Sequence, residues 1–236
     1  MNSRRSALSR TAAGAAVLAL LLLGAVPAAS AAEPAGHAGS SERPSAARQS
    51  VIRGGDSIYS AGRVCTVAFN ATDGAEDYAI TSGQCVSGGT NWYADAAMTV
   101  PVGATVGTSF PVNDFGVIRY TNPAVSHPGE VGTGSGDAVD ITGSASPVVG
   151  SSMCHIGRVS GMSCGTVTAV NVSVNYPDGT VSGLFSSSAR SEPGDAGGPA
   201  FTSGGKALGF IVGASAGSTF YQPIGEVLAT WGLTLS

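Results

Sequence analysis

The feature that most constrains the fold is a succession of short β-prone runs, each ended by glycine, asparagine, aspartate or proline. Apolar and β-branched side chains dominate six such runs, at residues 64–69, 78–82, 116–120, 181–185, 200–201 and 207–212. Runs of this length between turn residues are typical of β-strands. The longest run, residues 165–174, changes its apolar phase between Ala169 and Val170, which predicts a β-bulge or a strand buried on both faces.

Only one segment has a helical pattern, and it lies at the end of the chain. Its apolar residues recur at spacings of three and four between a proline and a glycine: Ile224, Val227, Leu228 and Trp231, with Pro223 before them and Gly232 after them. This pattern predicts a short C-terminal helix. Strands in succession with one terminal helix predict an all-β protein, either a sandwich or a pair of barrels, and composition does not choose between them.

The first 31 residues have the three parts of a secretory signal peptide. A basic stretch precedes an apolar run at residues 12–26, and Ala29 and Ala31 stand at the −3 and −1 positions. A membrane anchor is the alternative, but the run is shorter than the roughly 20 residues that a spanning helix needs. The pair Arg4 and Arg5 leaves the choice between general and twin-arginine export open.

Residues 32–50 are rich in small residues, proline and arginine without a period, which is typical of a linker or a short pro-segment. Residues 51–236 are long enough for one domain, or for two small barrels that share a core. They carry six arginine and lysine residues against thirteen aspartate and glutamate residues, a net charge of −7. Such an acidic surface argues against nucleic acid and anionic membranes as partners, and we expect a monomer.

The four cysteines form two local pairs in the sequence, Cys65 with Cys85 and Cys154 with Cys164. In an exported chain an even number of cysteines predicts disulfides, although four cysteines allow three pairings. Zinc binding is the rival interpretation. Because no Cys-x-x-Cys occurs and the three histidines are scattered, we expect no metal and no other cofactor.

A glycine-rich stretch from Glu192 to Phe201 reads Glu-Pro-Gly-Asp-Ala-Gly-Gly-Pro-Ala-Phe. Glycines of this kind allow a tight turn that points successive backbone N–H groups at one spot. The stretch resembles the nucleophile loop of trypsin-like serine proteases, Gly-Asp-Ser-Gly-Gly-Pro, with Ala196 at the position of the serine.

Other segments resemble the same family, in the family's order. They are Ile52-Arg53-Gly54-Gly55, Thr81-Ser82-Gly83-Gln84-Cys85, and residues 113–120, 161–169, 174–176 and 220–223. Together they cover essentially all of residues 51–236 and are similar to the bacterial streptogrisin and α-lytic protease branch. The resemblance implies two six-stranded antiparallel β-barrels, a C-terminal helix and a site in the cleft between the barrels.

The resemblance also assigns roles, with two chemical groups missing. Gln84 stands where the family has its histidine base, Asp114 at the triad aspartate and Ala196 at the serine, while the amides of Gly194 and Ala196 form the implied oxyanion hole. A methyl group is no nucleophile, and a glutamine amide does not titrate usefully in water. We therefore predict that the chain is not a working serine protease.

The substrate-binding strand departs from the family as well. Val212 stands where the family has a serine bonded to the triad aspartate, and Gly213 and Ala214 follow where the family has two glycines. We predict that the methyl group of Ala214 crowds the approach of a peptide backbone. Changes across the pocket favour a long-standing loss of catalysis.

His155 stands where the bacterial branch has a buried arginine that pairs with the aspartate before the serine. We hypothesise a buried pair of His155 with Asp195, which would raise the pKa of His155. The alternatives are Arg158 as the partner and His155 as a partly exposed strand residue. A triad relocated to other residues would need His127 or His155, and no other Gly-x-Ser-Gly loop supplies a nucleophile.

These observations predict a secreted, non-catalytic homologue of a serine endopeptidase that binds a peptide or protein ligand between its barrels. One alternative is a serine endopeptidase with residual or unconventional activity. Another is an inert structural domain in which the loop glycines serve only the fold.

Overall fold

A computed structural model describes residues 50–236 of the chain. The signal peptide predicted for residues 1–31 lies outside the described residues, as does the segment 32–49 of the predicted linker. Within residues 50–236, no helix is long and apolar enough to cross a membrane. The same residues contain no group of three or more histidine, cysteine, aspartate or glutamate side chains that could hold a metal ion.

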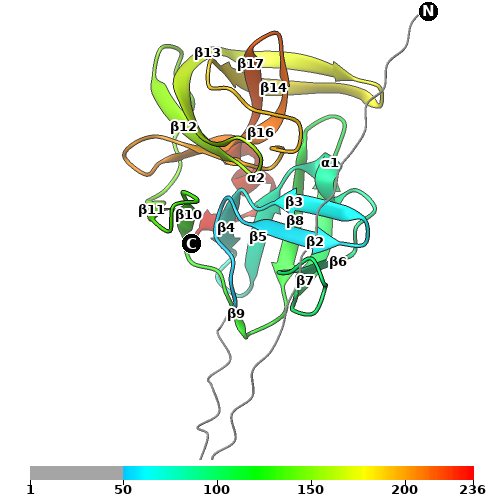
Figure 1. Cartoon of the computed structure of the whole chain (residues 1–236). Coiled ribbons are helices and arrows are strands. Elements are labelled where there is room, and N and C mark those ends of the chain that lie inside the picture. Colours follow the sequence, from blue (N-terminus) through cyan, green and yellow to red (C-terminus); the bar gives the residue numbers. More distant parts are fainter. Residues whose placement is uncertain (1–49) are drawn as a thin grey trace, which may run out of the picture. The chain divides into compact units, whose positions relative to one another are not determined.

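The first half of the domain is an antiparallel sheet with the strand order β18-β4-β5-β8-β7-β6-β2-β3 (Figure 1). Its strands are β2 (Ser57–Ser60), β3 (Arg63–Thr66), β4 (Phe69–Thr72), β5 (Asp77–Thr81), β6 (Asn91–Tyr93), β7 (Pro101–Ser109), β8 (Phe115–Tyr120) and β18 (Thr234–Leu235). A four-residue helix, α1 (Gly83–Val86), follows β5.

The second half is a closed six-stranded barrel with the order β12-β13-β14-β17-β16-β15. Its strands are β12 (Ser152–Gly157), β13 (Gly161–Tyr176), β14 (Gly179–Ser187), β15 (Pro199–Phe201), β16 (Ala207–Ser215) and β17 (Ser218–Pro223). Two small pairs complete the strands: β1 (Ser50–Val51) with β9 (Val125–Ser126), and β10 (Glu130–Gly132) with β11 (Ala138–Asp140). Closure leaves the second barrel without free edges.

The predicted fold class, two antiparallel barrels with a C-terminal helix, is confirmed. Helix α2 (Ile224–Trp231) ends at Gly232, whose φ of 63° gives the left-handed cap that glycine favours. The first sheet has eight strands rather than six, in part because the C-terminal strand β18 joins it by pairing with β4. Strand β13 carries register shifts on both sides of Val170, as the change of apolar phase predicted.

Apolar side chains hold the two halves together. One cluster fills the first sheet, around Trp92 and Ile118, and another fills the second barrel, around Phe185. A third and larger cluster joins the halves and contains Phe115 from the first sheet and Phe210 from the second barrel. Each such side chain contributes about 1.5–3 kcal/mol when fully buried, so the barrels are fixed against each other and so is any site between them.

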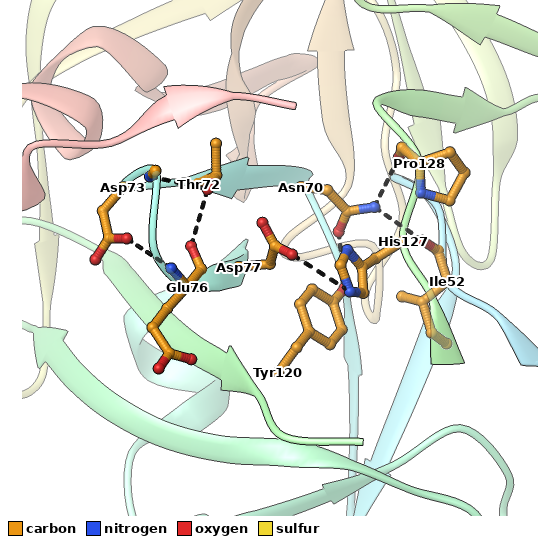
Figure 2. Close-up of polar contacts among 10 residues, drawn as sticks. Ile52, Asn70, Thr72, Asp73, Glu76, Asp77, Tyr120, His127 and Pro128 are labelled. Carbon is orange, nitrogen blue, oxygen red and sulfur yellow. Dashed lines mark hydrogen bonds and ion pairs between the residues drawn. The ribbon is translucent and has the colours of Figure 1, made fainter. Parts of the chain in front are cut away.

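The start of the described chain is fastened by a buried asparagine (Figure 2). The side-chain amide of Asn70 donates to the carbonyls of Ile52 and Pro128, at 2.8 Å each. Its oxygen accepts a 2.7 Å bond from the Tyr120 hydroxyl. Because these groups are buried, losing a partner would leave polar atoms without hydrogen bonds. The network therefore fixes where the chain enters the domain.

Candidate active site

Asp114 lies just before β8, and its carboxylate is fully buried. Its Oδ1 accepts hydrogen bonds from the hydroxyl of Ser82, at 2.9 Å, and from the backbone N–H of Gln84, at 2.8 Å. Its own backbone N–H donates to Oε1 of Gln222 on β17, so the aspartate is tied to both barrels. The second carboxylate oxygen, Oδ2, has no hydrogen-bond partner among the described residues.

Burial raises the pKa of Asp114, and the hydrogen bonds to its carboxylate offset this shift only in part. A carboxyl whose folded pKa is raised holds its proton more tightly in the folded state. The free energy of unfolding therefore falls as the pH rises from the pKa of Asp114 in the unfolded chain to its pKa in the folded protein. This loss of stability persists at neutral pH.

The Asp114→Asn variant is expected to be more stable than the wild type by about 1–2 kcal/mol at pH 7–8, because a neutral amide costs less to bury than an unpaired carboxylate. The gain should vanish below about pH 4, where the unfolded aspartate is protonated as well. Urea unfolding at several pH values measures the difference. A variant less stable than the wild type at pH 7 would contradict this account of Oδ2.

Gln84 is half-buried on α1, beside Asp114. Its side-chain amide makes no hydrogen bond to the described residues, although its backbone binds Asp114. The side chain lines a surface pocket of about 360 Å³ with Arg63, Phe110, Pro111 and Asp178. Since Asp178 belongs to the turn between β13 and β14 and the others to the first half, this pocket lies between the two halves.

Backbone hydrogen bonds hold the loop from Glu192 to Gly198. The buried carboxylate of Asp195 accepts N–H groups from Val159 at 2.7 Å, Ser160 at 3.1 Å and Glu192 at 2.7 Å. Burial raises the pKa of Asp195, but these hydrogen bonds outweigh it, so the net shift is downward. The loop is therefore built around one charged carboxylate.

Two backbone amides of this loop are not used. The N–H groups of Asp195, Gly197 and Gly198 donate to carbonyls at 2.8–3.1 Å. Those of Gly194 and Ala196 have no acceptor within the described part of the chain. Gly194 is exposed and Ala196 is half-buried, so solvent or a ligand can reach this part of the loop.

The loop lies against the segment that carries Gln84. A Cβ atom on Gly197, whose φ is 88°, would lie 2.4 Å from the carbonyl of Thr66 and 2.7 Å from the hydroxyl of Thr81. Only glycine fits this close approach. Thr81 lies three residues before Gln84, so the structure brings Ala196, Gln84 and Asp114 into one region, although no hydrogen bond joins their side chains.

Both predicted disulfides are confirmed. Cys65 is bonded to Cys85, which fastens α1 to β3 beside Gln84. Cys154 is bonded to Cys164 across the β12–β13 hairpin. All four cysteines are thereby used, which removes the zinc alternative for them.

The hypothesis of a His155–Asp195 pair is wrong. His155 is buried on β12, and its ring nitrogens lie 2.7 Å from the hydroxyl of Tyr221 and 3.0 Å from the carbonyl of Arg190. Burial lowers the pKa of His155, against the smaller raising effects of the Arg190 carbonyl and the Asp195 charge. The reason is that backbone amides already satisfy Asp195, so no cationic partner is needed. Arg158, the other proposed partner, forms no ion pair with it either.

Val212, Gly213 and Ala214 lie on β16 in the predicted order. Val212 is buried, and its carbonyl accepts a 3.0 Å hydrogen bond from the hydroxyl of Tyr176. Ala214 is exposed and lines a second pocket of about 280 Å³, together with Arg190, Ser191, Glu192, Ser215, Ala216, Gly217, Ser218 and Thr219. Whether the methyl group of Ala214 crowds a peptide stays a prediction.

A relocated triad finds no support in the described residues. His127 stacks on the ring of Tyr120, at 4.2 Å between centroids, and its Nε2 lies 3.8 Å from Asp77 (Figure 2). His155 approaches Ser187 only through the hydroxyl of Tyr221. Neither ring forms a hydrogen bond with a serine hydroxyl, as a serine nucleophile would require.

The sequence interpretation missed several groups in this region, among them Gln222, Tyr176 and Arg190. Gln222 and Tyr176 lie in segments that resemble the family. This resemblance is the only sequence feature that pointed to either residue. Their contacts span 108 and 36 residues of sequence, which local patterns do not show.

No protein-family model matches the chain, but individual proteins of known activity are similar to it. Glutamyl endopeptidase 2 of Streptomyces griseus is 41% identical over 189 residues, which cover 78% of this chain and 99% of that protein. Streptogrisin-D of the same species is 38% identical over 77% of this chain, which spans only 47% of that protein.

Two solved structures that are similar to this chain are also bacterial serine proteases. The α-lytic protease homolog N4 is 52% identical, with a TM-score of 0.74, over 78% of this chain and 99% of its own. A glutamic-acid-specific serine protease is 41% identical, with a TM-score of 0.75, over 78% of this chain and all of its own. The chain belongs to the family of bacterial chymotrypsin-like serine proteases.

Proposed function

We propose that this chain is an exported, non-catalytic member of its family that binds a peptide or protein ligand between its barrels. The observation that carries the proposal is the pairing of Gln84 and Ala196 with a buried Asp114 whose Oδ2 has no partner. In a working triad that oxygen orients and stabilises a histidine ring. Here a glutamine that does not titrate occupies the corresponding position, and a methyl group replaces the nucleophile.

Export is supported by the two disulfides, which persist in oxidising compartments. The predicted signal peptide supports it as well. Ligand binding is supported by the two pockets, about 360 and 280 Å³, that flank Gln84 and Ala214. Concave surfaces of this size are where proteins usually bind small ligands and side chains.

The glutamate specificity of one relative is not carried over to this chain. That glutamic-acid-specific protease uses a histidine triad in substrate binding. The described residues of this chain contain two histidines, and each is held by other contacts, His127 by Tyr120 and His155 by Tyr221. They cannot supply a set of three.

Residual endopeptidase activity is the second candidate, because the amides of Gly194 and Ala196 are free to bind a carbonyl. Triad-deficient serine proteases retain roughly 10³–10⁴-fold acceleration over water from such groups. A purely structural domain is the third candidate.

The deciding experiment exposes the purified protein to a broad panel of chromogenic peptides and to a fluorophosphonate probe. Glutamyl endopeptidase 2 serves as the active comparison. We expect no covalent labelling and a turnover at least about 10⁴-fold below the comparison, because no oxygen nucleophile is activated. Labelling of any serine, or turnover near that of the relative, would refute the non-catalytic assignment.

A further inference from the structure

The two unused amides of the loop make it a ready acceptor for an anion. Gly194 has a φ of 101°, and both neighbouring turns are fixed by bonds of Asp195 and Gly197. Unpaired backbone amides close together in such turns can form a concave site for negative charge. The site is accessible, since Gly194 is exposed and Ala196 is half-buried.

An arginine without a partner lies beside the same glycine. A Cβ atom on Gly194 would lie 2.8 Å from Nη2 of Arg158, so the guanidinium group packs against the loop. Arg158 is exposed and forms no ion pair or hydrogen bond with the described residues, whereas Arg53 pairs with Glu130. Arg119 and Arg190 also lack a side-chain partner among the described residues, so Arg158 is distinguished by its position against Gly194.

Two acids, Asp195 and Glu192, belong to the same loop, but neither forms an ion pair with Arg158. Asp195 is buried and satisfied by three backbone amides. Glu192 lines the adjoining pocket of about 280 Å³ and is exposed, and Arg190 lines the same pocket with no side-chain partner in the described residues. The guanidinium group of Arg158 therefore has no ion-pair partner within the described residues and is available to a negative charge supplied from outside.

We infer that the ligand is a peptide with a free C-terminal carboxylate, which accepts hydrogen bonds from the amides of Gly194 and Ala196 and faces Arg158. This inference rests on the proposed function. Without a nucleophile and a base, no bound carbonyl becomes an oxyanion, so the ligand must bring its charge already formed. Charge-assisted hydrogen bonds are about twice as strong as neutral ones, which selects a carboxylate over an amide.

The adjoining pocket receives the last side chain of that peptide. Its wall is made of small and hydroxyl-bearing residues, with an arginine and a glutamate at its lining: Arg190, Ser191, Glu192, Ala214, Ser215 and Thr219. A volume of about 280 Å³ with this lining suits a small or polar terminal residue.

The test uses the isotope-labelled protein and nuclear magnetic resonance. Two matched libraries of N-acetylated tetrapeptides, varied at the last residue, end either in a free carboxylate or in an amide, and sodium acetate is a third probe. We expect the carboxylate library to move the amide signals of Gly194 and Ala196 and to bind at least about tenfold more tightly than the amide library.

Charge variants test the role of Arg158. Arg158→Gln should weaken binding of the carboxylate peptides about three- to tenfold, an effect that high salt abolishes. Arg119→Gln removes another exposed arginine, on β8, and should leave the affinity unchanged.

The outcomes separate this inference from the proposed function. Cleavage of the peptides, seen by mass spectrometry, would refute the proposed function. Equal binding of carboxylate and amide libraries, or no movement of the two amide signals with either, would refute the carboxylate inference. Acetate that binds as tightly as the best peptide would show a small-anion site and would likewise overturn it.

Discussion

Replacing Asp195 by alanine is expected to lower the free energy of unfolding by about 3–5 kcal/mol. The side chain is fully buried and accepts three backbone N–H groups, from Val159, Ser160 and Glu192. Each buried donor left without a partner costs about 1–3 kcal/mol, and water replaces only some of the lost bonds. Chemical unfolding followed by circular dichroism measures the loss.

Two further variants make this result interpretable. Asp137→Ala removes an exposed carboxylate and should change stability by less than about 0.5 kcal/mol. Asp195→Asn keeps an oxygen for the amides of Val159 and Ser160 but turns an NH₂ group toward the N–H of Glu192. We expect an intermediate loss, because two donors then face each other. A loss below about 1 kcal/mol for Asp195→Ala would contradict the role assigned to this carboxylate.

The pH dependence of the same variants follows from the lowered pKa of Asp195. A carboxyl with a depressed folded pKa contributes stability above its unfolded value, and this stability is lost as the pH falls through the folded value. The gap between wild type and Asp195→Asn should therefore be full at pH 6–8 and shrink below about pH 4. A gap that stays constant down to pH 2 would show that charge plays no part.

The fold was largely predictable because its signals are local. Turn residues separate the strand runs, and the spacing of Ile224, Val227 and Trp231 with Gly232 behind them marks α2. Helix α1 was missed because four residues hold little more than one turn, too few for an apolar period to repeat. The pairing of β18 with β4 was missed because it joins the two ends of the domain, and no local pattern records such a pairing.

In the candidate site, too, the features with a local sequence motif could be predicted and those that depend on distant contacts could not. The glycine loop and the cysteine pairs stand in short motifs, so their positions followed from the sequence. The partners of buried polar groups did not. His155 was assigned to Asp195 by analogy, but the fold gives it Tyr221 and gives Asp195 the turn after β12. The unpaired Oδ2 of Asp114 is likewise a property of packing alone.

The unpaired Oδ2 of Asp114 leads to a second prediction, which concerns the recovery of catalytic activity. Ser82 and the backbone of Gln84 already hold Oδ1 of Asp114, and Oδ2 has no partner among the described residues. A histidine at position 84 could donate its ring N–H to this oxygen, which would fix its tautomer. The amides of Gly194 and Ala196, which have no acceptor among the described residues, would serve as the oxyanion hole that the family resemblance predicts.

The double variant Gln84→His/Ala196→Ser is therefore expected to react with the fluorophosphonate probe and to hydrolyse an activated ester at least about 10³-fold faster than the wild type. Because nucleophile and base act as a unit, each single variant should gain less than about tenfold. Removing the aspartate from the double variant with Asp114→Asn should cancel most of the gain, as a triad requires. An unreactive double variant that is folded would mean that the two side chains do not converge.

Peptide hydrolysis by the same double variant should lag behind ester hydrolysis, because the family resemblance predicts that a peptide also lies along β16. On β16 the carbonyl of Val212 already accepts a hydrogen bond from the hydroxyl of Tyr176, and Ala214 lines the pocket of about 280 Å³. Adding Ala214→Gly should raise peptide turnover about tenfold while leaving ester turnover unchanged, since only the longer substrate contacts that wall. Equal gains on both substrates would place the obstruction elsewhere, at the reacting groups themselves rather than along the strand that receives the peptide.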